Sequence, residues 1–290
     1  MKYQELSRFQ VASIVFSIVN ARDEQDSPLK DTYQDFISTT PPEIIISVSY
    51  GGLPQTVFRD SNLIFNSGGA WSLYRIDGQD AIVLGATPPG AVPYKIALFH
   101  KDKKQITLYS KEERPSSGLF PNPLEYPLSE VLMICLLALG RGLMVHACGI
   151  DDDGRGYLFA GNSTHGKSTM AQIWKDQALV LNDDRIVLRH RDGRFWMYGT
   201  PWHGDYTSVS PQGVPLHKIF FLHHGEKNSA VPRRSAEAVS ILLTRAFPPL
   251  WDKKGMDYTL GLLDRMASKL PCFELDFLPD KRIIDFVRNV

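Results

Sequence analysis

The sequence predicts a chain of two parts, a β-rich amino-terminal domain over residues 1–120 and an α/β domain with a mixed sheet over residues 121–290. Three observations predict this division. Apolar runs in the first 120 residues are short and separated by turn-forming residues, which is typical of strands. The segment 113–127 is rich in Pro, Ser and Gly and is expected to be a linker. Beyond it, strand-like and helix-like runs alternate, which indicates an α/β arrangement there and α+β for the chain as a whole.

The composition of the 290 residues, 43% hydrophobic and 22% charged, is that of a soluble globular protein. The 32 basic and 32 acidic side chains cancel, so neither nucleic acid nor an anionic membrane is expected as a partner. No apolar run reaches the roughly 18 residues that a membrane helix requires. Three scattered cysteines, Cys135, Cys148 and Cys272, are expected to be buried free thiols, which indicates a reducing, cytoplasmic location.

The amino-terminal elements are expected to form an antiparallel meander. Residues 9–19 predict a core strand; the run resembles the apolar part of a secretion signal, but neither a basic flank nor a cleavage site accompanies it. Residues 43–50 predict a second strand. Residues 70–86 and 94–110 each predict a hairpin, the first turning at an Asp-Gly pair and the second at a charged tip.

The carboxyl-terminal elements alternate in type. Residues 128–142 predict a buried helix that Ser129 caps and that Gly140 or Gly142 ends. The other expected elements are strands at 143–150, 156–161, 217–225 and 272–278, three strands within 178–199 with an acidic corner after the first, and helices at 236–247, 256–270 and 279–290.

A phosphate-binding motif lies between a strand-like and a helix-like run. The sequence "GNSTHGKS" fits the pattern G-x-x-x-x-G-K-[ST]. Glycines let successive backbone N–H groups point at phosphate oxygens, and the following helix adds its own unpaired N–H groups. The residues expected to bind nucleotide are Gly161, Asn162, Ser163, Thr164, His165, Gly166, Lys167, Ser168 and Thr169. Lys167 would reach the β- and γ-phosphates and Ser168 would offer its hydroxyl to Mg²⁺. The alternative is an ordinary glycine-rich turn.

Two adjacent carboxylates, Asp183 and Asp184, follow the strand-like run "ALVLN". In a parallel α/β unit the carboxyl end of a strand lies beside the phosphate loop of its neighbour, where a carboxylate holds Mg²⁺. Neighbouring residues on a strand point to opposite faces, so one carboxylate would meet the metal while the other faces the acceptor. The alternative is a pair that only caps a turn.

The stretch "LMVHACGIDDDGRGYLFAGNSTHGKST…LVLNDD" resembles the HPr serine kinase/phosphorylase family and, more distantly, phosphoenolpyruvate carboxykinase. The resemblance covers residues 143–190, where His146, the loop and the two aspartates match in order and approximate spacing. Arg245 is a looser match to an arginine that assists transfer. The resemblance implies a P-loop, mixed-sheet catalytic domain preceded by a β-rich domain, and the layout suggests acceptor recognition as the role of the latter. The first 120 residues do not align with the family.

The resemblance also implies roles for these residues. Lys167 and the loop amides would bind ATP, and Ser168 with Asp184 would hold Mg²⁺. Asp183 would accept the proton of an acceptor hydroxyl, with His146 hydrogen-bonded beside it. The acceptor would be a serine of a peptide or small protein, as in lasso-peptide tailoring or an HPr-like substrate. The alternatives are a small-molecule kinase, for example for free serine, and a nucleotide-binding regulator without transfer; a homo-oligomer is left open.

Some residues depart from the family pattern or carry weaker signals. Thr164 stands where family loops commonly have a glycine, and residues 198–206 replace a glycine-rich signature, which argues against the reverse, phosphorolytic reaction. Residues 199–206 predict either a substrate-facing loop with His203 or an ordinary turn. His223 and His224 adjoin at a strand end and point opposite ways without a ligand partner at suitable spacing, so no metal is expected there.

Overall fold

The computed structural model describes residues 4–20, 29, 31–54, 62–85, 93–112 and 122–290. The chain divides into two compact units, Met1–Met133 and Ile134–Val290. The division falls inside helix α1 (Leu128–Leu137). Most of the predicted linker, residues 113–121, lies outside the described residues. The fold combines helices with two large sheets, each of which contains both parallel and antiparallel strand pairs.

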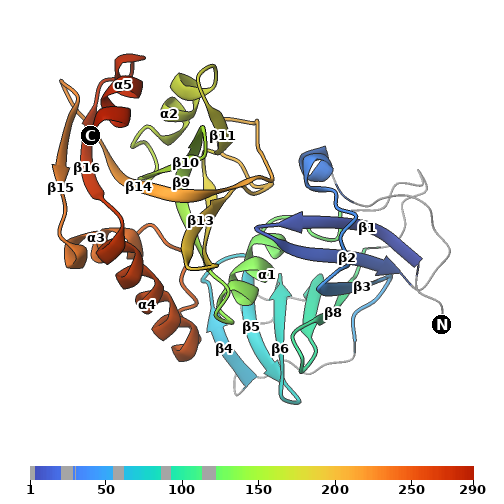
Figure 1. The fold of residues 1–290 in the computed structure, drawn as a ribbon. Helices are drawn as coiled ribbons and strands as arrows, with labels where there is room; N and C mark the ends of the chain where they lie inside the picture. Colours follow the sequence, from blue (N-terminus) through green and yellow to red (C-terminus); the bar gives the residue numbers. More distant parts are fainter. Residues whose placement is uncertain (1–3, 21–28, 30, 55–61, 86–92, 113–121) are drawn as a thin grey trace. The chain divides into compact units, whose positions relative to one another are not determined.

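The first unit is built on a sheet with the strand order β1-β2-β3-β8-β7-β6-β5-β4 (Figure 1). Its elements are β1 (Gln4–Val11), β2 (Ile14–Asn20), a 3-10 helix η1 (Asp31–Phe36), β3 (Ile44–Tyr50), β4 (Leu63–Asn66), β5 (Trp71–Ile76), β6 (Gln79–Leu84), β7 (Lys95–Phe99) and β8 (Gln105–Ser110). Only β4 to β8 form the expected antiparallel meander, because β3 pairs parallel with both β2 and β8.

The apolar run 9–19 is not one strand, as the sequence predicted, but a hairpin. Strand β1 ends at Val11 and β2 begins at Ile14, and the two residues between them make the turn. Ala12 and Ser13 have φ values of 51° and 59°, in the left-handed region that both residue types rarely adopt. The turn therefore has none of the Gly, Asn or Asp residues that normally mark such a hairpin.

The second unit contains a ladder of strands that closes on itself. The order is β10-β9-β12-β13-β14-β16-β15, β11 pairs with β9, and β14 also pairs with β10. Its strands are β9 (Leu143–Asp152), β10 (Arg155–Ala160), β11 (Leu179–Asn182), β12 (Arg185–Arg191), β13 (Arg194–Tyr198), β14 (Gly213–His224), β15 (Ser229–Pro232) and β16 (Cys272–Phe277). The long strand β14 makes the closure, since its first residues pair antiparallel with β13 and later ones pair parallel with β10.

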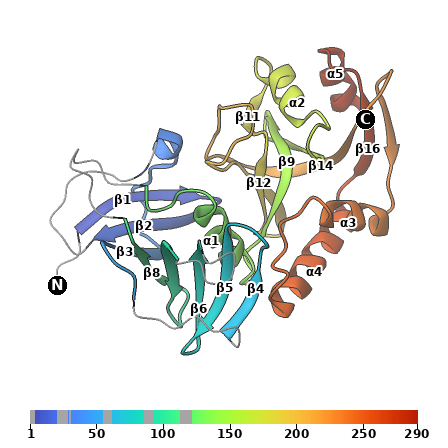
Figure 2. The same cartoon turned by 180° about the vertical axis from the view of Figure 1, so that it is seen from behind.

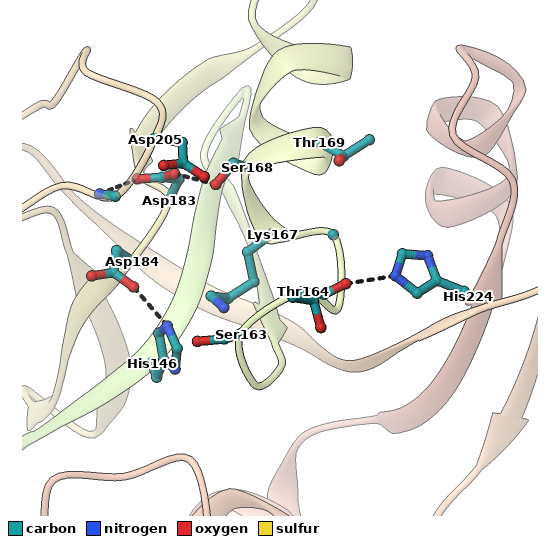
Figure 3. A pocket seen from close by; sticks show the side chains of 12 residues that line it. His146, Ser163, Thr164, Lys167, Ser168, Thr169, Asp183, Asp184, Asp205 and His224 are labelled. Carbon is teal, nitrogen blue, oxygen red and sulfur yellow. Dashed lines mark hydrogen bonds and ion pairs between the residues drawn. The ribbon is translucent and has the colours of Figure 1, made fainter.

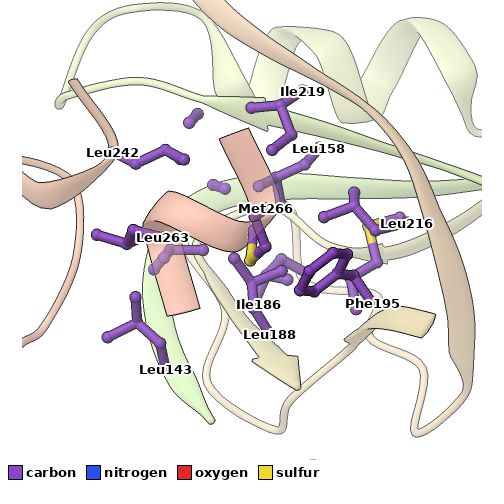
Figure 4. Close-up of a cluster of buried hydrophobic side chains, with 14 of the residues drawn as sticks. Leu143, Leu158, Ile186, Leu188, Phe195, Leu216, Ile219, Leu242, Leu263 and Met266 are labelled. Atoms are coloured by element: carbon purple, nitrogen blue, oxygen red, sulfur yellow. The ribbon is translucent and has the colours of Figure 1, made fainter. Parts of the chain in front are cut away.

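Two helix layers cover the strands of this unit, as Figures 1 and 2 show from opposite sides. Helices α3 (Ser235–Leu243) and α4 (Lys253–Lys269) contribute to one core cluster with β9, β12 and β14, and Figure 4 shows Met266 of α4 beside Ile186 of β12. Helices α2 (Lys167–Trp174) and α5 (Arg282–Asn289) bury their apolar residues in a second cluster with β10, β14 and β16.

Most expected elements of this unit are present within a few residues of their predicted bounds. One exception is α1, which begins at Leu128 as predicted but ends at Leu137, before Gly140 and Gly142. Ser129 lies inside this helix and so is not its cap. Strand β15 of this unit and strand β4 of the first unit were not predicted. Among the described residues, no helix has both the length and the apolarity to cross a membrane.

Candidate functional site

The predicted phosphate loop connects the end of β10 to the start of α2. Gly166 occupies the position before the helix with φ 89° and ψ 23°, a left-handed conformation that glycine adopts without strain. No side chain caps α2 at this end. The unpaired N–H groups of its first turn and the positive end of its dipole are therefore available to an anion.

Thr164, at the tip of the loop, also has a left-handed φ of 70°. A β-branched residue rarely adopts this conformation, so surrounding contacts must hold it. One such contact comes from the end of β14, where Nε2 of His224 donates to the carbonyl oxygen of Thr164 over 2.6 Å. The loop thus keeps, with a threonine, a backbone shape that glycine would normally supply.

Lys167, the first residue of α2, extends its side chain back across the loop (Figure 3). Its Nζ donates to the carbonyl oxygen of Asn162 over 2.9 Å, and the residue is only 6% exposed. Burial lowers the pKa of Lys167, while the charges of Asp184 and Asp183 act in the opposite direction. The ammonium group therefore lies between the loop and the two carboxylates, where it can neutralise a bound phosphate.

Asp183 is 1% exposed and its carboxylate is held by three donors. Oδ2 accepts hydrogen bonds from Oγ of Ser168 over 2.6 Å and from the backbone N–H of Tyr206 over 3.0 Å, and Oδ1 accepts from the N–H of Gly204 over 2.8 Å. A buried carboxylate with this many donors is fixed in position. Asp183 joins the start of α2 to the loop that follows β13.

Asp184 makes a separate set of contacts. Oδ1 lies 2.6 Å from Nε2 of His146 and Oδ2 lies 2.5 Å from a guanidinium nitrogen of Arg185. Burial by itself would raise the pKa of Asp184, but the hydrogen bond from His146 and the charges of Arg185, His146 and Lys167 outweigh it and lower the pKa. The carboxylate is therefore ionised at neutral pH, and it lies between the imidazole of His146 and the guanidinium of Arg185.

Strand pairing places these residues together. Arg185 at the start of β12 pairs with His146 on β9, and the carbonyl oxygen of Asp184 accepts from the N–H of Ala147. The sequence-based reason for this proximity was wrong, because β10 and β11 are not adjacent parallel strands; both are antiparallel to β9, which lies between them. The two aspartates reach the loop across β9.

A cavity of about 420 Å³ lies between the loop and the acid pair (Figure 3). The residues that line it are His146, Ser163, Thr164, Gly166, Lys167, Ser168, Thr169, Asp183, Asp184, Gly204, Asp205 and His224. The structure thus brings the loop, the two aspartates and His146 to one place.

Four predicted residues do not line this cavity. Gly161 and Asn162 form the base of the loop, and Nδ1 of His165 lies 3.0 Å from the carbonyl oxygen of Leu222, which turns the imidazole toward β14. The backbone of Arg245 lies beside β9, where its carbonyl oxygen accepts from the N–H of His146. Its guanidinium instead donates to the carbonyl oxygen of Ile241 and to Oγ1 of Thr244, and burial lowers its pKa.

The partners within the site differ from those expected. Ser168 was expected to share a metal with Asp184, and His146 was expected to pair with Asp183. The structure has the opposite arrangement, with Ser168 bonded to Asp183 and His146 bonded to Asp184. Asp183 and Asp184 form the connection between β11 and β12 and are not neighbours on a strand, as the sequence predicted, so the alternation of strand side chains does not decide which of them turns toward the helix.

Sequence analysis did not select three of the cavity residues. Gly204 and Asp205 belong to the loop 199–206, for which the sequence predicts either a substrate-facing loop with His203 or an ordinary turn. His203 itself is half-buried and does not line the cavity. His224 had been weighed only as a metal ligand. Its position beside His223 at the end of β14 could have indicated a place in the cavity, because neighbouring strand residues point to opposite faces. His224 lines the cavity, whereas Nε2 of His223 lies 3.0 Å from Oε1 of Glu274.

Comparison with known proteins shows a partial likeness to solved structures. No family model matches the chain, and no curated protein matches it. Among solved structures, the chain is similar to one titled "Structure of the Hpr(Ser) kinase/phosphatase from Coxiella burnetii", with 13% sequence identity and a TM-score of 0.32 over 50% of this chain and 94% of that one. The assignment of a function therefore depends on the site itself.

Proposed function

We propose that this chain is a kinase that binds a nucleoside triphosphate, ATP in the first instance, with Mg²⁺ and transfers the γ-phosphoryl group to a hydroxyl. One observation carries the proposal: a single cavity has the phosphate loop with Lys167 on one side and the acid pair with His146 on the other. Phosphoryl transfer mainly requires positioning and neutralisation of charge, and these residues are suited to both.

The loop is suited to the phosphates of the donor. A Cβ on Gly166 would lie 2.6 Å from Cζ of Phe277, so only glycine lets the backbone pack this closely at the start of α2. The uncapped helix end and the buried ammonium of Lys167 add positive potential on the same side of the cavity.

The donor atoms also fit a magnesium ion. Oγ of Ser168 and Oδ2 of Asp183 are 2.6 Å apart, and Mg²⁺ binds such hard oxygens while keeping several waters. The described residues contain no cluster of three or more His, Cys, Asp or Glu side chains that could hold a metal, and Mg²⁺ in kinases does not need one. Bound there, Mg²⁺ would neutralise charge on the β- and γ-phosphates.

Asp184 is the proposed acceptor-side carboxylate. It would accept the proton of the hydroxyl as the hydroxyl oxygen bonds to the γ-phosphorus and the bond to the β–γ bridging oxygen breaks, which releases the diphosphate. His146 would orient this carboxylate through the observed 2.6 Å contact. This assignment exchanges the roles expected for the two aspartates, because Asp183 is already engaged with Ser168.

The acceptor is proposed to be a serine in a peptide or small protein. The support is the resemblance of residues 143–190 to serine kinases of that kind. ATP turnover measured without acceptor, with free serine and with serine-containing peptides separates this acceptor from a small molecule. Binding of MgATP without transfer to any acceptor would instead indicate a nucleotide-binding regulator.

Two aspartate variants test the division of roles. Asp184→Asn should reduce transfer by about 100-fold or more while MgATP affinity is retained, since a positioned base contributes about that factor. Asp183→Asn should weaken binding of ATP in the presence of Mg²⁺. Asp192→Asn, which changes an acid in the turn between β12 and β13, is the matched control and should alter neither quantity. Melting curves of all three variants show whether each still folds.

The kinase proposal fails if the wild-type chain does not bind MgATP. The role assignment fails if Asp184→Asn transfers at the wild-type rate, or if it loses nucleotide affinity as Asp183→Asn does.

A further inference from the structure

The two ends of the cavity differ in chemistry. At one end lie the carboxylate of Asp184 and the imidazole of His146, and at the other lie Thr169 and His224. Figure 3 shows Lys167 and Thr164 between these ends. A ligand that fills the cavity therefore meets acids at one end and an aromatic ring at the other.

The direction of a bound nucleotide follows from this arrangement. In loops of this type the backbone amides cradle the α- and β-phosphates and the lysine reaches the β- and γ-phosphates. The γ-phosphate must face the acceptor, and the acceptor-side carboxylate is Asp184. The nucleoside consequently extends the opposite way, past the first turn of α2 toward His224.

The imidazole of His224 is held in place on this path. Its Nε2 donates to the carbonyl oxygen of Thr164, and its ring stacks on Phe277 with the centroids 6.1 Å apart and the planes at 28°. Phe277 is 1% exposed, whereas His224 is exposed and lines the cavity. One face of the imidazole is thus backed by a buried ring, and the exposed part of the residue contributes to the lining of the cavity.

We propose that His224 is the platform on which the base of the nucleotide stacks, an assignment that rests on the proposed function and adds to it the part of the donor that this side chain binds. A flat ring with fixed orientation offers a π surface to an uncharged, flat group and loses little side-chain entropy in doing so. Stacking of this kind is tolerant of base identity, so purine nucleotides bind with similar affinity and pyrimidine nucleotides more weakly.

Affinity measured by calorimetry for two probes tests the assignment. The probes are MgATP and magnesium tripolyphosphate, which carries the same phosphate chain without a base. His224→Ala should weaken MgATP binding by roughly 5- to 150-fold, the range for loss of one base–aromatic stack. It should leave the affinity for tripolyphosphate within about twofold.

Two further variants separate stacking from support of the loop. His224→Phe keeps an aromatic ring but loses the hydrogen bond to Thr164, and it should retain most of the MgATP affinity. His217→Ala removes an exposed imidazole earlier on β14, beside Tyr157, and should change neither affinity.

Several outcomes overturn the assignment. Equal losses for both probes in His224→Ala would show that His224 acts through the loop backbone. The same loss of MgATP affinity in His224→Phe as in His224→Ala would lead to the same conclusion. Equal affinity of the wild-type chain for the two probes would show that no base is bound. These results leave the kinase proposal standing, which fails separately if the wild-type chain binds neither probe or transfers no phosphoryl group.

Discussion

Replacement of Gly166 by alanine tests how tightly the loop backbone packs at the start of α2. A Cβ at this position would lie 2.6 Å from Cζ and 3.2 Å from Cε1 of Phe277. Phe277 is 1% exposed and packs in the cluster beneath α2 and α5, so its ring has little room to move. The added methyl group therefore forces the loop or the ring out of place.

The cost has three parts. Overpacking of a buried site costs about 1–3 kcal/mol. The left-handed φ of 89° costs alanine about 1–2 kcal/mol more. Alanine has fewer conformations than glycine in the unfolded chain, which stabilises the folded state by about 0.4–1 kcal/mol and offsets part of this cost. The free energy of unfolding should thus fall by about 3 kcal/mol.

Gly154 supplies a matched control. Its φ is 82°, but no atom lies within 4 Å of the position that its Cβ would occupy. Gly154→Ala should therefore show only the conformational cost, a decrease of about 1 kcal/mol. Phe277→Leu combined with Gly166→Ala should be less destabilising than the sum of the two single changes, because the clash is relieved.

Urea unfolding followed by circular dichroism gives these free energies, and titration with MgATP then reports the effect on the loop. We expect Gly166→Ala to weaken MgATP binding at least about tenfold, since displaced amides no longer converge on the phosphates. The reasoning is refuted if Gly166→Ala costs no more than Gly154→Ala, or if the double variant shows no coupling.

Three other predictions follow from buried charges and thiols. Arg288→Ala removes two hydrogen bonds to Asp152, whose side chain is 2% exposed, and leaves Arg155, 3.3 Å away, as its cationic partner. The free energy of unfolding should fall by about 2 kcal/mol in urea titrations, and a change below about 1 kcal/mol would contradict this. The pKa of Asp184 in the folded chain is below its usual 3.8. Its ionised carboxylate therefore stabilises the folded state fully above about pH 4, and this contribution is lost as pH falls through the lower folded pKa. Asp184→Asn should flatten that part of a profile of unfolding free energy against pH. Burial raises the pKa of Cys148 well above its usual value and that of Cys272 to about 11, so mass spectrometry after iodoacetamide treatment of the native chain near pH 8 should find both thiols unmodified.

The sequence revealed strands most reliably where a turn carried its own chemical signal. Asp77-Gly78 joins β5 to β6, and Asp192-Gly193 joins β12 to β13, with all four residues at positive φ as such turns require. The turn between β1 and β2 uses the same backbone region without those residue types, so the run 9–19 gave no indication of a break.

The candidate site also has one part that the sequence revealed and one part that it did not. The loop from Gly161 to Ser168 could be recognised because its function depends on residues that are contiguous in the sequence. The neighbours of the acids could not, because Asp183 takes its donors from Ser168 on one side and from a loop about twenty residues later on the other. Those contacts depend on the antiparallel pairing around β9, which local periodicity does not encode.

The closed ladder of the second unit has a consequence for how such a site can vary. Strands β9, β10, β12, β13 and β14 each pair with two others of the ring, so none can slip by a residue without breaking its ladder on both sides. Substitutions or insertions in the connecting loops leave this frame intact. The segment 199–206, which contributes Gly204 and Asp205 to the cavity, can therefore vary while His146 on β9 and the start of the phosphate loop after β10 keep their positions.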